Sequence, residues 1–157
     1  MTKYLLSSFF CLTLFTACVS DDNANKHPDP EHLEVTIYDK QGKAVAYSNF
    51  LAQEEVVIYL WNGKPTTYYV SENENELYGF NGEFIGWREA GIYYDLEGKR
   101  IGFEKGALDL PTQEEPTKNV KEVLPVKSVK QATPAKHAKS VNWSEESLEA
   151  FLQKGVK

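Results

Sequence analysis

Four copies of one tyrosine–glycine–aromatic pattern constrain the fold of this chain more than any other feature. The copies are IYDKQGKAVAY, IYLWNGKPTTY, LYGFNGEFIGW and YYDLEGKRIGF. In each copy a glycine follows a tyrosine by four residues, and an aromatic residue follows the glycine by five. The aligned positions are Tyr38, Tyr59, Tyr78 and Tyr94, then Gly42, Gly63, Gly82 and Gly98, then Tyr47, Tyr68, Trp87 and Phe103. This regularity predicts four copies of one structural unit.

Each unit has the chemistry of a β-hairpin. Asp or Asn beside Gly favours a tight turn with a bulge, in which the glycine adopts a positive φ. After the turn, large side chains alternate with small or polar ones, as at Val45 and Tyr47 or Ile85 and Trp87, and this is the period of a strand. One hairpin is marginal in water, but four can bury their aromatic faces together. We therefore predict an all-β domain of four consecutive hairpins packed around a common centre.

The same residues carry a resemblance to a known family. The segments LWNGKPTTY, YGFNGEFIGW and GIYYDLEGKRIGF resemble proteins of the 4-fold beta flower family, over roughly Val35 to Gly106. The resemblance implies an all-β fold in a bacterial envelope or secreted protein. It implies no catalytic residues, because the family has no assigned activity.

The composition changes sharply after the repeats. Residues 33–110 hold 14 of the 20 aromatic residues and nine of the ten glycines. Residues 111–140 hold four prolines, six lysines and no aromatic residue, and such a composition buries too little apolar surface to offset the loss of chain entropy. We therefore expect residues 33–110 to form a β domain that folds without its tail, and residues 111–140 to form a flexible, solvated linker.

The last segment, residues 141–157, predicts a short amphipathic helix. Ser144 suits its N-cap, and Trp143 could pack on Leu148 as a hydrophobic staple. A helix of about ten residues is not stable alone in water, so its apolar face must dock. That face consists of Trp143, Leu148, Phe151 and Leu152. Docking onto its own domain is the simpler expectation, and docking onto a partner protein is the alternative.

The N-terminus has the parts of a bacterial lipoprotein signal. Lys3 precedes a short apolar run, and the run ends in LFTAC, which resembles a lipobox. We expect residues 1–17 to be removed and Cys18 to carry the lipid that anchors the protein in the membrane. A buried core helix is the alternative for the apolar run, and an ordinary cleavage site near a free cysteine is the alternative for LFTAC.

Residues 18–32 follow as an acidic tether. Its first residues, CVSDDN, resemble the Ser-Asp-Asp signal that sends some Gram-negative lipoproteins to the outer face of the outer membrane. We therefore expect an outer-membrane lipoprotein of the cell envelope, with surface exposure favoured by this signal; a solvated acidic spacer is the alternative. Without residues 1–17 the chain has 16 basic and 23 acidic residues, a net charge of −7. This charge argues against a nucleic-acid partner.

The repeat region holds few groups that carry chemistry. It contains no His and no Cys, which excludes a His-based triad or a zinc site within it. We expect no cofactor, no metal and no catalytic residue, since nucleotide-binding glycine patterns do not occur either. Glu72, Glu74 and Glu76 alternate and could bind Ca²⁺ or form an acid pair, but a charge-guarded edge strand is the simpler interpretation. Asp39 and Asp95 stand where a turn favours Asp.

These observations favour a noncatalytic, membrane-anchored module that binds an envelope protein. The alternative is a glycan- or cell-wall-binding lipoprotein that stacks exposed aromatic residues on sugar rings. Trp61 is the candidate contact, because it lies near a hairpin tip where the other copies have Lys40, Phe80 and Leu96. Partial burial against a neighbouring hairpin is the competing interpretation of Trp61. An enzyme that uses carboxylates is the least favoured class.

The lipobox interpretation predicts the outcome of replacing Cys18. Cys18→Ala should remain an unlipidated precursor, because alanine cannot form the thioether to the lipid. Mass spectrometry of the N-terminal peptide checks this, with Cys11→Ala as the control that should be lipidated normally. A lipid-modified N-terminal peptide from Cys18→Ala would contradict the anchor assignment.

Overall fold

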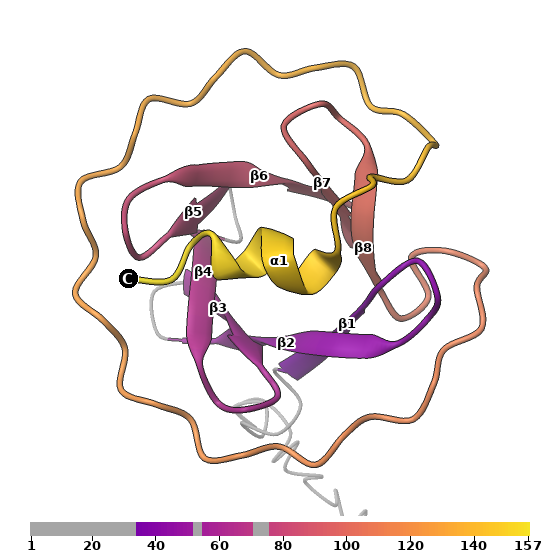
Figure 1. The fold of residues 1–157 in the computed structure, drawn as a ribbon, viewed down its shortest axis with the longest axis horizontal. Helices are drawn as coiled ribbons and strands as arrows, with labels where there is room; N and C mark the ends of the chain where they lie inside the picture. The colour runs from indigo at the N-terminus through magenta and orange to yellow at the C-terminus, as the bar shows by residue number, and fades with distance from the viewer. Residues whose placement is uncertain (1–33, 52–54, 71–75) are drawn as a thin grey trace, which may run out of the picture.

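The computed structural model describes residues 34–51, 55–70 and 76–157. These residues form a closed antiparallel barrel of eight strands, in which each strand pairs with its sequence neighbours and β8 pairs with β1. The elements are β1 (Glu34–Tyr38), β2 (Ala44–Phe50), β3 (Glu55–Leu60), β4 (Pro65–Val70), β5 (Glu76–Gly79), β6 (Phe84–Glu89), β7 (Ile92–Tyr94), β8 (Arg100–Glu104) and α1 (Leu148–Gln153). Figure 1 shows the four hairpins around a centre over which α1 lies. The predicted fold class is confirmed.

Each hairpin turns at the glycine of its repeat. In the first hairpin the Gly42 amide donates to the Asp39 carbonyl at 2.9 Å, and the Asp39 amide donates to the Lys43 carbonyl at 3.0 Å. Both bonds recur at equivalent positions in the other hairpins, and the strand register shifts just before the turn in all four. The four glycines, Gly42, Gly63, Gly82 and Gly98, have φ of 72°, 89°, 88° and 77°. The predicted turn with a bulge is confirmed.

The predicted role of the turn aspartates is confirmed as well. One carboxylate oxygen of Asp39 accepts the amides of Gln41 and Lys43 at 2.9 and 3.0 Å. Asp95 accepts the amides two and four residues later at 2.9 Å each. Both carboxylates therefore satisfy the backbone of their own turns.

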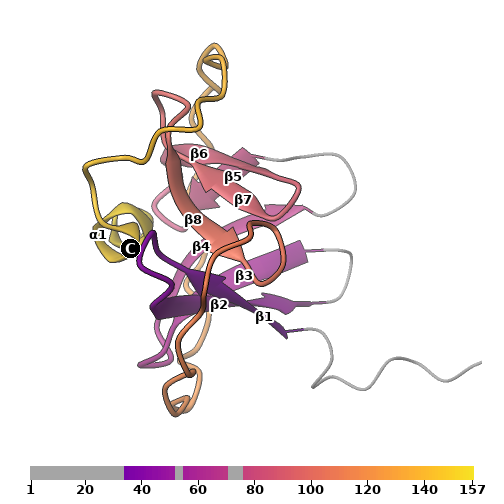
Figure 2. The ribbon, with the colours of Figure 1, turned by 90° about the vertical axis from the view of Figure 1, so that its right-hand side faces the viewer.

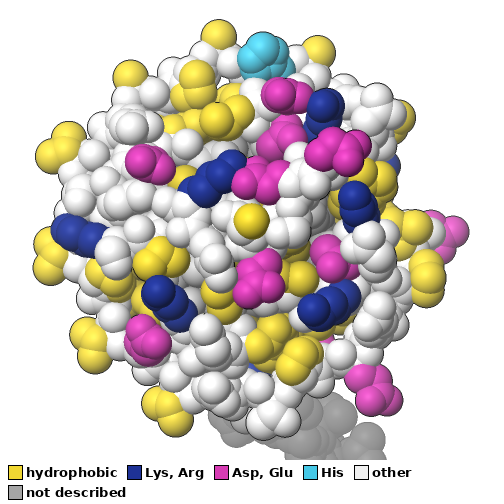
Figure 3. All heavy atoms as spheres, in the orientation of Figure 1, with side chains coloured by type: hydrophobic (Ala, Val, Ile, Leu, Met, Phe, Trp, Pro, Cys, Tyr) yellow, Lys and Arg dark blue, Asp and Glu magenta, His cyan; other side chains and the backbone are white. Residues whose placement is uncertain are grey.

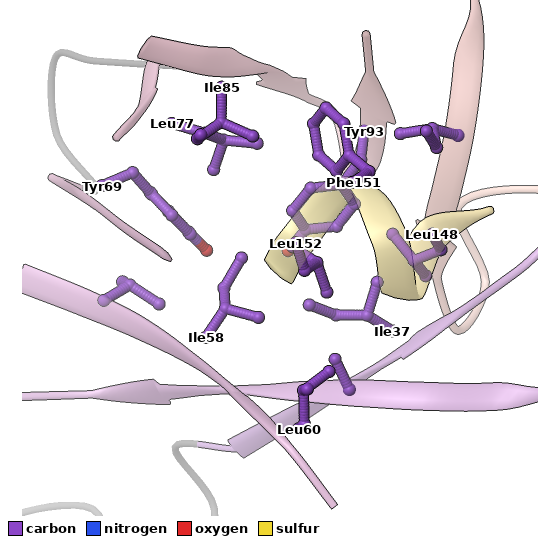
Figure 4. Close-up of a cluster of buried hydrophobic side chains, with 13 residues drawn as sticks. Ile37, Ile58, Leu60, Tyr69, Leu77, Ile85, Tyr93, Leu148, Phe151 and Leu152 are labelled. Atoms are coloured by element: carbon purple, nitrogen blue, oxygen red, sulfur yellow. The ribbon is translucent and has the colours of Figure 1, made fainter. Parts of the chain in front are cut away.

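The strands are buried on both faces. Successive side chains point to opposite faces, so one set packs inside the barrel and the other set packs on its outer face. Ile37, Ile58, Leu77 and their neighbours fill the interior of the barrel (Figure 4). The repeat aromatics, such as Tyr47 and Tyr68, belong to clusters on the outer face and are no more than 3% exposed. The outside of this barrel therefore needs cover as much as its inside needs filling.

The helix α1 closes one end of the barrel (Figure 2). Its side chains Leu148, Phe151 and Leu152 are at most 1% exposed and pack in the same cluster as the inward strand residues (Figure 4). Strand glycines make room for them. A Cβ at Gly86 would lie 2.9 Å from the Phe151 ring, and a Cβ at Gly102 would lie 2.9 Å from a Leu148 methyl group. The close approach of the helix therefore depends on glycine at these strand positions.

The helix begins later than the sequence predicts. Its N-cap is Ser147, whose hydroxyl accepts the amide three residues later at 3.2 Å, rather than Ser144. Trp143 does not act as a staple: its segment pairs in parallel with Arg100, and its ring packs on Phe103 at 6.2 Å. The physical reason is tertiary, since pairing with β8 holds the residues before Ser147 extended.

Two expectations about the tail also change. The face formed by Leu148, Phe151 and Leu152 docks onto its own barrel, so it is not free to serve as a partner-docking face. These side chains complete the inner core, so residues 33–110 alone would lack part of it; that they fold without their tail stays a prediction. Residues 111–140 contain no helix or strand, but they surround the barrel instead of extending into solvent as a linker (Figure 1).

The N-terminal predictions lie outside the described residues. Residues 1–33 include the predicted signal peptide, Cys18 and the acidic tether. Within the described ranges, no helix is long and apolar enough to cross a membrane.

The packing of α1 predicts a strong effect of shortening its buried side chains. Leu152→Ala should lower the free energy of unfolding by about 2–5 kcal/mol, because it leaves a cavity in the inner core. The neighbouring Gln153 is exposed, so Gln153→Ala should change the free energy of unfolding by less than about 0.5 kcal/mol. Urea unfolding followed by tryptophan fluorescence measures both, and equal effects would refute the placement of α1 in the core.

Candidate polypeptide-binding surface

Residues 107–142, termed the belt, run around the outside of the barrel and pass the four hairpin tips in order (Figure 1). At each tip the carbonyl of the repeat glycine accepts a hydrogen bond from a belt amide. The pairs are Gln113 with Gly42, Glu122 with Gly63, Gln131 with Gly82 and Ser140 with Gly98, at 2.8, 2.9, 2.8 and 2.8 Å. The four donors are spaced nine residues apart, so one hairpin corresponds to nine belt residues.

The repeat glycines are needed for the belt as well as for the turns. Belt carbonyl oxygens stand where a Cβ on these glycines would be, namely those of Pro111, Val120, Val129 and Ala138. Any side chain at a tip would therefore push the belt away from the barrel. All four glycines are buried, although they lie at hairpin tips.

The belt sequence has the same period of nine. Three consecutive units, PTKNVKEVL, PVKSVKQAT and PAKHAKSVN, begin at Pro116, Pro125 and Pro134. Each has a lysine two residues after the proline and a second lysine three residues later. The preceding unit, ALDLPTQEE, has Asp109 and Thr112 at the lysine positions. This period is the sequence signal that could have predicted the belt, and the expectation of a linker overlooked it.

Four aromatic pairs lie on the outer face where neighbouring hairpins meet. At each of these boundaries, termed seams, the last aromatic residue of one repeat lies opposite the tyrosine of the next. The pairs are Tyr47 with Tyr59, Tyr68 with Tyr78, Trp87 with Tyr94, and Phe103 with Tyr38. All eight side chains are 7% exposed or less. The repeat aromatics therefore form four equivalent patches along the path of the belt.

Belt lysines lie over three of the four seams. The ammonium nitrogens are 4.2–5.5 Å from the centroids of seam rings, which is the geometry of cation–π contacts. The contacts are Lys118 to Tyr47 at 4.7 Å, Lys127 to Tyr68 at 4.2 Å, Lys130 to Tyr78 at 4.4 Å and Lys139 to Tyr94 at 5.5 Å. At the fourth seam, Trp143 packs on Phe103. Three seams thus share one mode of lysine recognition.

Carboxylates at the strand ends complete the lysine sites. Glu34 accepts hydrogen bonds from Lys118 and Lys121 at 2.5 and 2.6 Å. Burial alone would raise the pKa of Glu34, but the two lysines outweigh it and hold that pKa below its ordinary value. The corresponding ion pairs at the next two seams are Glu55 with Lys127, and Glu89 with Lys136 and Lys139. Because each partly exposed pair contributes about 0–1 kcal/mol, the belt depends on the number of its contacts.

Burial also affects the titration of the seam tyrosine Tyr47. Desolvation, with smaller contributions from Glu34 and Tyr59, raises the pKa of Tyr47 to about 12. Tyr47 therefore stays neutral at physiological pH. The positive charges of Lys118 and Lys121 are therefore balanced by Glu34 and not by a tyrosinate at Tyr47.

Trp61, the predicted ligand contact, is half-buried. Its ring packs on Tyr47 at a centroid distance of 5.3 Å, and the Lys118 ammonium group lies 5.6 Å from it. It also borders a shallow depression of about 250 Å³, whose polar lining residues are Lys43, Asn62 and Glu149. Partial burial, the competing interpretation, is what the structure shows.

An ion pair that the sequence did not single out joins β6 to β8. The guanidinium group of Arg88 donates to both carboxylate oxygens of Glu104 at 2.7 and 2.8 Å, and the Tyr93 hydroxyl donates to the same carboxylate at 2.9 Å. Burial lowers the pKa of Arg88, but the bonds to Glu104 outweigh it and raise that pKa overall. Both oxygens of Glu104 are engaged, so this cluster ties strands together and offers no free base. The pairing register of β6, β7 and β8 brings these residues together.

The predicted acidic row is partly visible. Glu72 and Glu74 lie outside the described residues. Glu76 accepts hydrogen bonds from the hydroxyls of Thr133 and Tyr78 at 3.0 and 3.3 Å. Among the residues that the structure describes, no group of three or more His, Cys, Asp or Glu side chains could hold a metal ion.

These features define a class of protein: a closed barrel of four hairpins, encircled and capped by its own tail. The family model of the 4-fold beta flower protein matches residues 35–152, and the chain belongs to this family. The match includes the belt and all but the last residue of α1 in addition to the hairpins. No curated protein and no solved structure matches the chain.

The double role of the tip glycines predicts a difference between two alanine substitutions. Gly82 and Gly106 have nearly the same φ, 88° and 84°, but only at Gly82 would a Cβ meet the belt. In both variants, backbone strain should lower the free energy of unfolding by about 1–3 kcal/mol. The free energy of unfolding should fall further in Gly82→Ala than in Gly106→Ala, because the new Cβ displaces the Val129 carbonyl. The displaced belt of Gly82→Ala should also become accessible to proteases. Thermal unfolding and limited proteolysis compare them; equal losses with an uncut belt would contradict this contact.

Proposed function

We propose that this protein is a noncatalytic envelope lipoprotein that acts as a protein-interaction module. Lipid on Cys18 would hold it in the outer membrane, and residues 18–32 would separate the barrel from the lipid surface. The observation that carries the proposal is that the outer surface of the barrel binds an extended polypeptide, the belt, through contacts that repeat at four hairpin tips.

The contacts of the belt are those by which proteins recognise extended peptides. Main-chain hydrogen bonds at the tips accept any residue except proline, which has no N–H to donate, so they contribute affinity with little specificity. Lysine sites at the seams, such as that of Lys118 between Tyr47 and Glu34, select the side chain. A surface with both kinds of contact suits the binding of polypeptide chains.

A glycan-binding role has one observation in its favour. Trp61 borders a depression lined by Lys43, Asn62 and Glu149, a combination of an aromatic ring and hydrogen-bonding groups that suits a sugar. The other repeat aromatics are buried beneath the belt and cannot stack on sugars while it is in place. Protein interaction is therefore the better-supported function.

Photo-crosslinking in cells tests the proposal. A photoreactive amino acid at Val129, which is 94% exposed on the belt, should form an adduct with one discrete envelope protein. The adduct should be lost in Cys18→Ala, which would not reach the membrane surface. The absence of a protein adduct, together with saccharide-dependent quenching of tryptophan fluorescence that Trp61→Ala abolishes, would overturn the proposal in favour of glycan binding.

A further inference from the structure

The belt and the barrel carry opposite charges. Residues 34–104 contain 12 acidic and six basic residues, a net charge of −6. The three lysine-bearing units, residues 116–142, contain six lysines and one glutamate, a net charge of +5. The barrel therefore attracts lysine-rich chains in general, and the seams place its glutamates and tyrosines where such a chain runs.

Few apolar side chains of the belt itself are buried. Its valines Val120, Val123, Val126 and Val129 are between 82% and 94% exposed. In Figure 3, hydrophobic side chains stand singly around the rim of the molecule and form no continuous patch. The belt is held by hydrogen bonds, ion pairs and lysine–aromatic contacts, which are individually weak and which break one at a time.

The contacts of the belt are also local to each unit. Glu122 bonds to one hairpin tip and Gln131 to the next, while the lysines between them cover the seam. One unit can therefore leave the barrel while α1 remains packed in its end. Segments with few buried apolar contacts belong to the low-stability part of a protein and open first.

We propose that the three lysine-bearing seams are the binding site for a lysine-rich, extended segment of a partner protein, and that the belt is a built-in competitor that occupies this site until the partner displaces it. The partner segment carries Pro-x-Lys-x-x-Lys at nine-residue spacing, the pattern that the seams already accept. This inference rests on the interaction function proposed above, and it adds the chemistry of the ligand and a means of regulation.

Competition from the tethered belt sets the affinity that a partner segment needs in order to bind the seams. A tethered segment acts at an effective concentration of about millimolar, so free peptide binds the intact protein weakly. Weakening the belt without changing the barrel should therefore raise the apparent affinity for a peptide in trans. Such a gain is the expected signature of a built-in competitor.

The experiment measures peptide binding to the full chain by fluorescence anisotropy. The probe is a labelled peptide with three copies of Pro-Thr-Lys-Ser-Ala-Lys-Ser-Thr-Ser, and the control peptide has the same composition with the two lysines adjacent. The belt-weakened protein carries Lys118→Ser, Lys121→Ser, Lys127→Ser and Lys130→Ser. The double variant Lys127→Ser, Lys130→Ser replaces it if the fourfold variant does not fold. A matched protein adds Glu34→Gln and Glu55→Gln, or Glu55→Gln alone in the double variant.

The proposal expects the probe to bind the belt-weakened protein at least tenfold more tightly than the wild type. The control peptide should show no such gain, and the added glutamate substitutions should abolish it. Unchanged affinity, or equal gains for both peptides, would overturn the proposal. Self-association of the belt-weakened protein in light scattering, with exclusion of the probe, would overturn it in favour of a second copy of this chain. None of these failures affects the crosslinking test at Val129, which does not require the belt to leave.

Discussion

Each hairpin of this barrel carries large side chains on both faces, and the rest of the structure depends on covering them. Ile58 faces the interior and Tyr47 the exterior, and both are fully buried. Eight strands can fill a barrel interior with their own side chains, but they cannot cover its outside. The belt provides that cover, and α1 closes the end. The tail is therefore part of the fold, although it contains almost no regular secondary structure.

A shared period allows one segment to cover four hairpins. The belt advances by nine residues from each tip to the next, and each tip presents a glycine that has no Cβ and whose carbonyl accepts a belt amide. Contacts of this kind are weak singly and strong only in number, and few apolar side chains of the belt itself support them. The same segment can therefore complete the barrel and still be displaced unit by unit, which links the stability of the fold to its proposed role in binding.

The sequence predicts the hairpins well because their determinants are local. Gly82 requires a positive φ and Asp39 satisfies its own turn, and both signals lie within a few residues. The sequence does not predict the belt in the same way, because its determinants are distant along the chain. The Glu122 amide donates to the Gly63 carbonyl, and the composition of residues 111–140 does not indicate this contact. The period of nine was visible at Pro116, Pro125 and Pro134, but only the four-fold barrel gives it meaning. The ion pair of Arg88 with Glu104 likewise depends on the pairing register of β6, β7 and β8.

Amide hydrogen exchange, resolved by residue along the tail, tests the central claim most directly. If the belt is bound at each hairpin tip, the amides of Gln113, Glu122, Gln131 and Ser140 should exchange slowly, in a pattern that repeats every nine residues. The amides of Asn119 and Ser128, which donate to the carbonyls of Trp61 and Phe80 at 3.0 and 2.9 Å, should also be protected. Uniformly fast exchange from residue 111 to residue 140 would mean that the tail is a free linker and that the outer aromatic pairs are covered by something else.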